Sequence, residues 1–268
     1  MFQMFFGMPA RIVNEQGKAI QGTLGFIGAM LKIIRMVRPT HLILIFDGEH
    51  ENARCGLDAE YKANRPDYSK VCEEENPFSQ LPDIYRALDQ LKIRYIETTD
   101  CEADDLIAAY ALAFDRIAEV VISSFDSDFF QLITDKVSVL RYRGEKTTVC
   151  TPEFVKEKFG IAPEQYADFK SLVGDSADNI RGAEKVGVKT AASLLCEFGT
   201  LENILFCAEK IRKVSVRESI IRNAEKLRIN YQMIKLKRGA ALPFEWRDLE
   251  YCDGGETTNG VLKSIGLR

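Results

Sequence analysis

Acidic residues crowd one short stretch of the sequence, residues 100–105, where four of the six side chains carry a carboxylate. From Leu106 onward apolar residues recur at helical spacing, so residues 102–105 are predicted to form the first turn of a helix. On that turn Glu102 and Asp105 share a face. Acids at a helix start can simply complement the exposed amides and the positive end of the helix dipole. The stretch therefore indicates chemistry only if further carboxylates converge on it.

Further carboxylates follow predicted strands or a helix end. Asp47 ends the apolar run 41–46, and an acidic pair follows the apolar run 120–123. Both runs are predicted to be buried parallel strands, and ligands of open α/β sheets bind at the carboxyl ends of such strands. A last pair is spaced i, i+3 after residue 174. The candidate metal-site residues are Asp47, Glu102, Asp104, Asp105, Asp126, Asp128, Asp175 and Asp178.

These eight acids cannot share a pocket without cations, because like charges at close range repel. Ligation by oxygen alone selects hard cations, which predicts Mg²⁺ or Mn²⁺ and excludes Zn²⁺. Without the eight acids the formal net charge of −4 becomes +4. Residues 208–238 hold ten Lys or Arg against three Glu, a local balance of +7. Such a run is often a solvated helix face, but beside an acidic pocket it is also typical of a metal-dependent nuclease.

The elements that must position these residues follow an α/β order. Helices are predicted over 22–38 and 81–91, and strands over 41–46, 93–96 and 120–123, which is a doubly wound pattern to about residue 140. Thr151 and Pro152 form a helix start, and the chain is predicted to be largely helical to about residue 232. We expect an α/β catalytic domain over 1–150, a helical region over 151–240 and an unassigned tail over 241–268.

The glycine-rich stretch 180–191 superficially resembles a phosphate-binding loop. That motif requires Gly-Lys directly, whereas here Val188 separates Gly187 from Lys189, and no apolar strand precedes it. An NTPase is therefore rejected. Two helices joined by a Gly-containing turn would instead form a hairpin whose backbone amides can hold a phosphate.

Taken together, the motifs strongly resemble the 5′-nuclease superfamily, which includes flap endonucleases, phage 5′-exonucleases and the N-terminal domain of bacterial DNA polymerase I. The resemblance covers about residues 1–240. Its motifs, in order, are Ile45-Phe46-Asp47, Tyr61-Lys62-x-x-Arg65, Glu102-Ala103-Asp104-Asp105, Asp126-Ser127-Asp128, Gly174-Asp175-x-x-Asp178-Asn179-Ile180, and Gly182 with Val186-Gly187-x-Lys189-Thr190-Ala191. Each alone is weak, but together they are specific.

The resemblance implies a PIN-like parallel sheet flanked by helices, a helical arch over about 52–82, and a helix–three-turn–helix element over about 170–197 that binds duplex DNA. It implies that the eight acids hold two Mg²⁺ or Mn²⁺ ions, directly or through water. Lys62 and Arg65 match arch residues that contact the scissile phosphate. The expected positions for DNA phosphate and a K⁺ ion in the hairpin are Gly182, Val186, Gly187, Lys189 and Thr190.

The sequence departs from the family at its start. Family members begin with an apolar strand that ends in a metal-site aspartate, whereas residues 1–6 correspond to the helix after that strand. Our hypothesis is that Met1 is an internal methionine and that the native protein starts upstream. If the first aspartate is truly absent, the alternative is a non-catalytic protein that binds branched DNA. A PIN-type ribonuclease is a third interpretation, although the hairpin exceeds what that class needs.

The expected function is a 5′-3′ exonuclease or flap endonuclease in DNA replication and repair. Its expected partner is DNA with 5′ flaps, branches or nicks; whether RNA primers are cut stays open. Seven widely spaced cysteines without a Cys-x-x-Cys motif indicate reduced thiols. The start does not resemble a signal peptide, and no segment is long enough to span a membrane. We therefore expect a cytoplasmic monomer.

Overall fold

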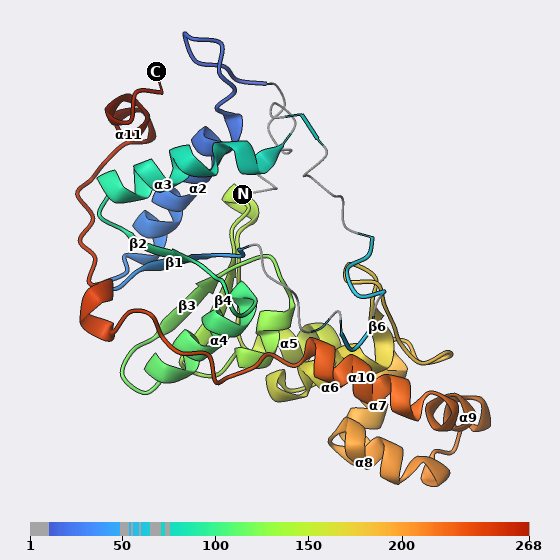
Figure 1. Cartoon of the computed structure of the whole chain (residues 1–268). Coiled ribbons are helices and arrows are strands. Elements are labelled where there is room, and N and C mark those ends of the chain that lie inside the picture. Colours follow the sequence, from blue (N-terminus) through green and yellow to red (C-terminus); the bar gives the residue numbers. More distant parts are fainter. Residues whose placement is uncertain are drawn as a thin grey trace. The chain divides into compact units, whose positions relative to one another are not determined.

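The computed structural model describes residues 11–48, 54, 56–58, 60–64, 71–72 and 76–267 (Figure 1). The chain divides into two compact units. Unit 1 comprises residues 1–47, 66–97 and 243–268, and unit 2 comprises residues 48–65 and 98–242. Within the described ranges, no helix has the length and apolar character that crossing a bilayer requires.

Unit 1 combines helices with a short parallel strand pair. Helix α2 (Gln21–Val37) and helix α3 (Leu81–Gln90) pack against each other, and α11 (Thr258–Ser264) contacts both. Strands β1 (Ile43–Phe46) and β2 (Arg94–Glu97) are parallel. The predicted helices 22–38 and 81–91 and strands 41–46 and 93–96 are thus confirmed to within about two residues.

Strand β1 differs from its prediction in burial. It was expected to be fully buried, but its four residues are all of intermediate exposure. The reason is that β1 pairs with β2 alone among the described strands, so its other edge has no strand partner in this part of the chain. Strand β3 (Val120–Ser123) also pairs along one edge only among the described strands, and Val121 is 40% exposed. Both predictions of a buried strand were therefore wrong in burial, although right in position.

Unit 2 contains a three-stranded sheet followed by helices. Strand β3 is parallel to β4 (Val137–Arg141), which is antiparallel to β5 (Thr148–Cys150). Helix α4 (Ala103–Phe114) begins immediately after Glu102, as predicted. The core under the sheet contains Phe129, Phe130 and Val139, all at most 1% exposed. Strands β4 and β5 were not predicted.

The second half of unit 2 is largely helical, as expected. Thr151 caps α5 (Pro152–Phe159) by accepting the backbone N–H of Phe154 at 3.4 Å, which confirms the predicted helix start. The remaining helices are α6 (Tyr166–Val173), α7 (Val188–Phe198), α8 (Leu201–Phe206), α9 (Val214–Arg222) and α10 (Ala224–Ile234). Between α6 and α7, strands β6 (Gly174–Asp175) and β7 (Ile180–Arg181) form a two-residue antiparallel ladder. The parallel α/β region followed by a helical region is the predicted fold class.

Within the expected arch over about 52–82, the structure describes residues 54, 56–58, 60–64, 71–72 and 76–82. At its end, the 3₁₀ helix η2 (Pro77–Gln80) leads directly into α3. Arg65 and residues 1–6 also lie outside the described part of the chain.

Candidate metal centre

The first group of carboxylates gathers around a buried arginine. Glu102 precedes α4 and Asp105 lies in its first turn, so the two side chains share a face as the helical spacing predicted. Arg54 forms ion pairs with both, and its Nη2 donates to Asp105 Oδ1 at 2.7 Å. The side chains of all three are 4–7% exposed. A buried charge requires such a partner, because desolvation without one is costly.

Lys62 connects this group to a second acidic loop. Its Nζ lies 2.8 Å from Glu102 Oε1, while its backbone N–H donates to the carbonyl of Asp178 at 3.1 Å. Asn64 donates to the carbonyl of Ser176 at 3.3 Å, and Asn179 donates to the carbonyl of Glu60 at 2.9 Å. Residues 60–64, which lie within the expected arch, are therefore attached to the loop between β6 and β7.

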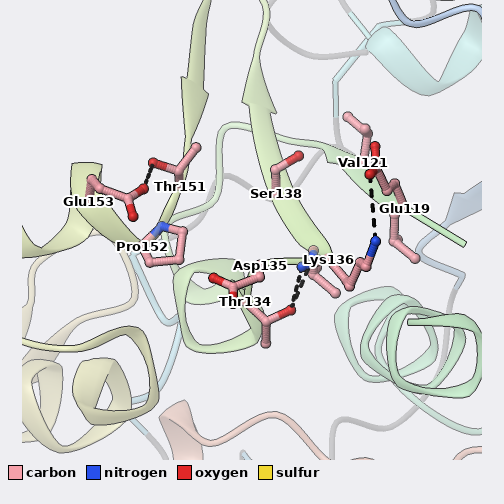
Figure 2. A pocket seen from close by; sticks show the side chains of 11 residues that line it. Glu119, Val121, Thr134, Asp135, Lys136, Ser138, Thr151, Pro152 and Glu153 are labelled. Atoms are coloured by element: carbon pink, nitrogen blue, oxygen red, sulfur yellow. Dashed lines mark hydrogen bonds and ion pairs between the residues drawn. The ribbon is translucent and has the colours of Figure 1, made fainter. Parts of the chain in front are cut away.

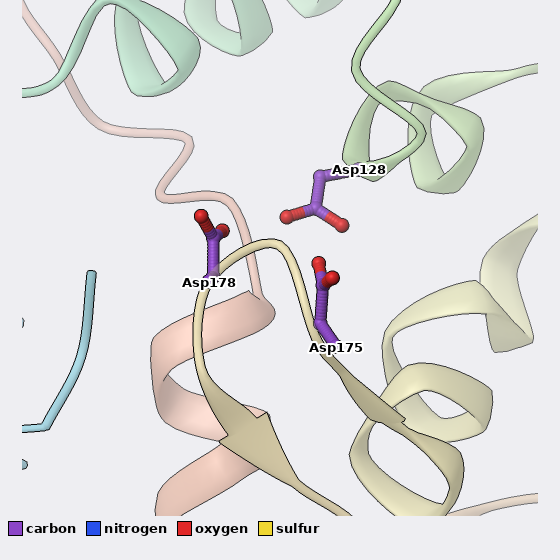
Figure 3. Close-up of side chains that lie close together, drawn as sticks. All are labelled: Asp128, Asp175 and Asp178. Atoms are coloured by element: carbon purple, nitrogen blue, oxygen red, sulfur yellow. The ribbon is translucent and has the colours of Figure 1, made fainter. Parts of the chain in front are cut away.

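The second group of carboxylates consists of Asp128, Asp175 and Asp178 (Figure 3). Asp128 begins the 3₁₀ helix η3 (Asp128–Leu132) after β3, and the other two belong to the β6–β7 hairpin. Each offers one carboxylate oxygen, and the three oxygens lie within 4.8 Å of one another. Residues 47 or more positions apart in sequence thus meet, as the element-end pattern predicted.

Lys170 on α6 neutralises part of this second group. Its ammonium forms ion pairs with Asp128 and Asp175, and its side chain is 8% exposed. Burial raises the pKa of Asp128 to about 6, opposed by Lys170 and reinforced by Asp126. Burial alone would lower the pKa of Lys170, but the two carboxylates raise it above its usual value. Although burial opposes the shift, Lys170 lowers the pKa of Asp175. The ammonium remains charged throughout the physiological range.

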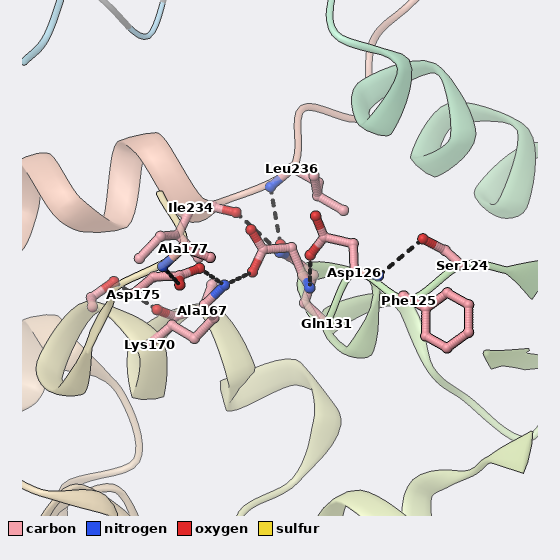
Figure 4. A network of polar contacts seen from close by, with 12 residues as sticks. Ser124, Phe125, Asp126, Gln131, Ala167, Lys170, Asp175, Ala177, Ile234 and Leu236 are labelled. Atoms are coloured by element: carbon pink, nitrogen blue, oxygen red, sulfur yellow. Dashed lines mark hydrogen bonds and ion pairs between the residues drawn. The ribbon is translucent and has the colours of Figure 1, made fainter. Parts of the chain in front are cut away.

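The other predicted acids occupy different positions. Asp126 Oδ1 accepts the backbone N–H of Asp128 at 2.8 Å, which holds the turn after β3 (Figure 4). Asp104 is half-buried in the first turn of α4. Asp47 is exposed, follows β1 and belongs to unit 1, whereas the other seven acids belong to unit 2.

The predicted hairpin places its residues between β7 and the start of α7. Gly182 approaches the backbone of Leu172 and Val173 so closely that an added Cβ would lie 2.3–2.5 Å from their atoms. Val186 is buried and its N–H donates to the carbonyl of Ala183 at 3.2 Å. Gly187 caps α7; Lys189 is exposed and Thr190 is half-buried in its first turn.

Two buried amides fix the backbone beside these groups, and neither was predicted. Asn230 on α10 donates to the carbonyls of Ser171 and Arg181, at 3.1 and 2.9 Å, on either side of the acidic hairpin. Gln131 donates to the carbonyl of Ile234 at 3.1 Å and accepts the N–H of Leu236 at 3.0 Å (Figure 4). A lone polar residue on an otherwise apolar helix face was the available signal for Asn230, as it was for Lys170. Nothing in the irregular stretch around Arg54 pointed to that residue.

A separate hollow lies at the opposite end of the unit 2 sheet (Figure 2). Its lining includes Val120 and Val137, which begin β3 and β4, together with Pro152. The carboxylates instead follow the ends of strands or helices, so this hollow is not part of the candidate metal centre.

The donor set is suited to a divalent cation. Every candidate ligand is a carboxylate oxygen, which matches the preference of hard cations. Where no cation is bound, Arg54, Lys62 and Lys170 supply the compensating positive charge. The site could exchange these contacts for metal ligation without leaving buried carboxylates unpaired.

Two family models match the chain in succession. Residues 1–160 match the N-terminal resolvase-like domain of 5′-3′ exonucleases, and residues 161–256 match their C-terminal SAM fold. The 5′-3′ exonuclease of Buchnera aphidicola subsp. Schizaphis graminum is 34% identical over 225 residues, covering 80% of this chain and 76% of that protein. DNA polymerase I of Bacillus subtilis is 33% identical over 99% of this chain, but the chain spans only 30% of the polymerase.

Solved structures share the fold. A phage T5 5′-exonuclease with bound zinc has a TM-score of 0.68 and 23% identity, with 83% of each chain covered. The catalytic core of Rad2 in complex with a DNA substrate has a TM-score of 0.59 and 15% identity, covering 98% of this chain and 87% of that one. At 23% and 15% identity, the similarity to these two structures shows a shared fold alone.

Proposed function

The chain belongs to the 5′-3′ exonuclease family, and we propose that it is a metal-dependent nuclease that hydrolyses phosphodiester bonds near DNA 5′ ends or at 5′ flaps. The observation that carries the proposal is the meeting in unit 2 of carboxylates from η3 and the β6–β7 hairpin, with Glu102 linked to that hairpin through Lys62. A metal-dependent nuclease needs such a site, because bound cations neutralise both the carboxylates and the reacting phosphate.

We assign the acids to two cation sites. Glu102, Asp104, Asp105 and Asp126 would hold one cation, and Asp128, Asp175 and Asp178 the second. Asp47 would act through water. Bound Mg²⁺ or Mn²⁺ would activate water and stabilise the leaving 3′ oxygen, giving products with a 5′-phosphate and a 3′-hydroxyl.

The basic residues would bind the reacting phosphate. Lys62 contacts Glu102 here, and once a cation neutralises that carboxylate its ammonium becomes available to the phosphate. Together with Arg65 it would stabilise negative charge that develops during hydrolysis. The terminal nucleotides must unpair to reach the centre, which costs a few kcal/mol that phosphate contacts can offset.

The hairpin would bind the duplex. Gly187 opens α7 with Lys189 and Thr190 in the first turn, so backbone amides and two polar side chains are available to a phosphate. A K⁺ ion near Gly182, Val186 and Gly187 is part of the same proposal. In this proposal, residues 1–150 carry out catalysis and residues 151–240 bind DNA. Flap, nicked and branched duplexes are the proposed substrates of a cytoplasmic monomer.

The test compares the wild-type chain with Asp104→Asn on a 5′-labelled flap duplex in Mg²⁺. We expect the wild type to release the flap and the variant to lose about 10²-fold or more of that rate, since a ligand oxygen of the metal centre is removed. Asp115→Asn, at the other end of α4, is the matched control and should cleave normally. Flap binding without cleavage by the wild type would instead support a non-catalytic binder of branched DNA.

A further inference from the structure

A short basic segment, residues 235–238, is attached to the candidate metal centre. We call it the basic strap. It follows α10, which ends at Ile234. Gln131, itself 3% exposed, pairs with the backbone of Ile234 and Leu236 much as a neighbouring strand would (Figure 4). Because Gln131 lies in η3 with Asp128, the strap is fixed to an element that carries a candidate ligand.

A second attachment reaches the first group of acids. The backbone N–H of Lys237 donates to Asp105 Oδ1 at 2.8 Å, the same oxygen that accepts from Arg54. Asp105 is 3% exposed, so this contact is shielded from solvent. The backbone of the strap is therefore held at the metal centre by two side chains from different elements, independently of its own side chains.

The side chains of the strap are not used in these attachments. Lys237 and Arg238 are exposed, and neither forms a salt bridge with any described residue. Three other cations of the same basic run are neutralised: Arg217 pairs with Glu209, Arg222 with Glu184, and Arg228 with Glu202 and Glu225. Lys237 and Arg238 differ from the remaining cations of the run because their backbone is attached beside the carboxylates.

Lys235 shows that the strap carries concentrated positive charge. Burial lowers the pKa of its ammonium, and the guanidinium of Arg238 lowers it further. Like charges held together by a fixed backbone favour a polyanionic ligand, because binding relieves their repulsion.

We propose that Lys237 and Arg238 bind DNA backbone phosphates next to the scissile one, so that the strap positions the substrate at the carboxylates. The inference rests on the proposed nuclease function and assigns these residues a binding role in it. Their contacts are electrostatic, so they contribute to affinity and to its salt dependence.

The test measures binding of a 5′-flap duplex in Ca²⁺ without cleavage, at several salt concentrations. The variant Lys237→Gln/Arg238→Gln should lower the slope of log Kd against log salt by about 2, one for each lost phosphate contact. The matched control Lys136→Gln/Lys146→Gln removes the same charge from the residue before β4 and from the 3₁₀ helix Gly144–Lys146, both outside the region proposed to bind DNA. This control should leave the slope of log Kd against log salt unchanged. The variant Lys237→Arg/Arg238→Lys keeps both charges and should also keep the wild-type slope.

Substrates with a neutral methylphosphonate next to the scissile phosphate locate the contact. This replacement should weaken binding by the wild type but not by Lys237→Gln/Arg238→Gln. Equal slopes for the variant and its control, or equal methylphosphonate effects, would overturn the proposal. Cleavage by the wild type is measured in parallel: normal cleavage with no slope change refutes the strap alone, whereas a slope change without cleavage refutes the nuclease and retains the strap as a DNA contact.

Discussion

Arg54 holds a buried positive charge against Glu102 and Asp105. Arg54→Met should therefore destabilise the metal-free protein by about 3–5 kcal/mol, because two buried carboxylates lose a partner. In Mg²⁺ the loss should be smaller, since a bound cation supplies the missing charge. Urea unfolding in EDTA and in Mg²⁺ measures both values. Arg116→Met, an exposed position just after α4, is the control. Equal losses with and without Mg²⁺ would contradict a cation at this group.

Asp128 should give the metal-free protein a recognisable pH dependence. Its pKa is about 6 when folded against an ordinary 3.8, so the folded state binds more protons between these values. The contribution of Asp128 to stability therefore falls as pH rises from about 4 to 6. The free energy of unfolding of Asp128→Asn should therefore rise relative to that of the wild type over this window. Above about pH 7 the difference between the two proteins should be constant. Thermal unfolding of both proteins in EDTA across this range measures the difference in stability. A difference that is the same at every pH would refute the raised pKa.

Residue by residue, the sequence identified acids better than their partners. Asp128, Asp175 and Asp178 could be predicted to meet because each lies at an element end, where topology concentrates ligands. Arg54 could not, because its contact with Asp105 joins residues 51 positions apart and depends on the path of an irregular segment. Lys170 was missed because periodicity places it on a helix but does not say which charge it faces.

At the scale of elements, the close approach of Gly182 to the end of α6 fixes the acidic hairpin. Gly182→Ala should destabilise the protein by about 1–3 kcal/mol or more, because the new methyl group overlaps backbone atoms that cannot move aside. Chemical denaturation measures the change. Gly239→Ala, where nothing lies within 4 Å of the added Cβ, should stay within about 0.5 kcal/mol of wild type. A tolerated Gly182→Ala would show that the hairpin can shift.

Local signals decided which elements were predicted. Helix α4 has apolar residues at helical spacing after an acidic first turn, and α5 has a capping threonine followed by proline, so both were found. Strands β4 and β5 were missed because a short strand is defined by its pairing, and β4 pairs with β3 only after the chain has passed through η3. Burial of β1 was overestimated, since an apolar run does not reveal how many neighbours the strand has.

At the scale of the whole molecule, cation binding should be visible as stability. A cation that binds the folded state alone stabilises it by about 2.7 kcal/mol at a hundredfold excess over its Kd. The Tm of the wild type should thus rise from EDTA to saturating Mg²⁺. The rise should shrink in Asp175→Asn/Asp178→Asn, which removes two candidate ligands. An unchanged rise in this variant would place the bound cation elsewhere.

The interleaved path of the chain has a consequence for biosynthesis. The chain passes four times between the two units, and residues 243–268 return to unit 1 after unit 2 is complete at residue 242. In unit 1, the backbone N–H of Leu42, the residue before β1, donates to the carbonyl of Leu249 at 2.9 Å, so the segment that leads into β1 contacts a late segment. On the ribosome, the β1–β2 pair and unit 2 can therefore form before residues 243–268 supply this contact. A protein truncated after residue 242 would retain every acid of unit 2 and still leave Leu42 without this partner.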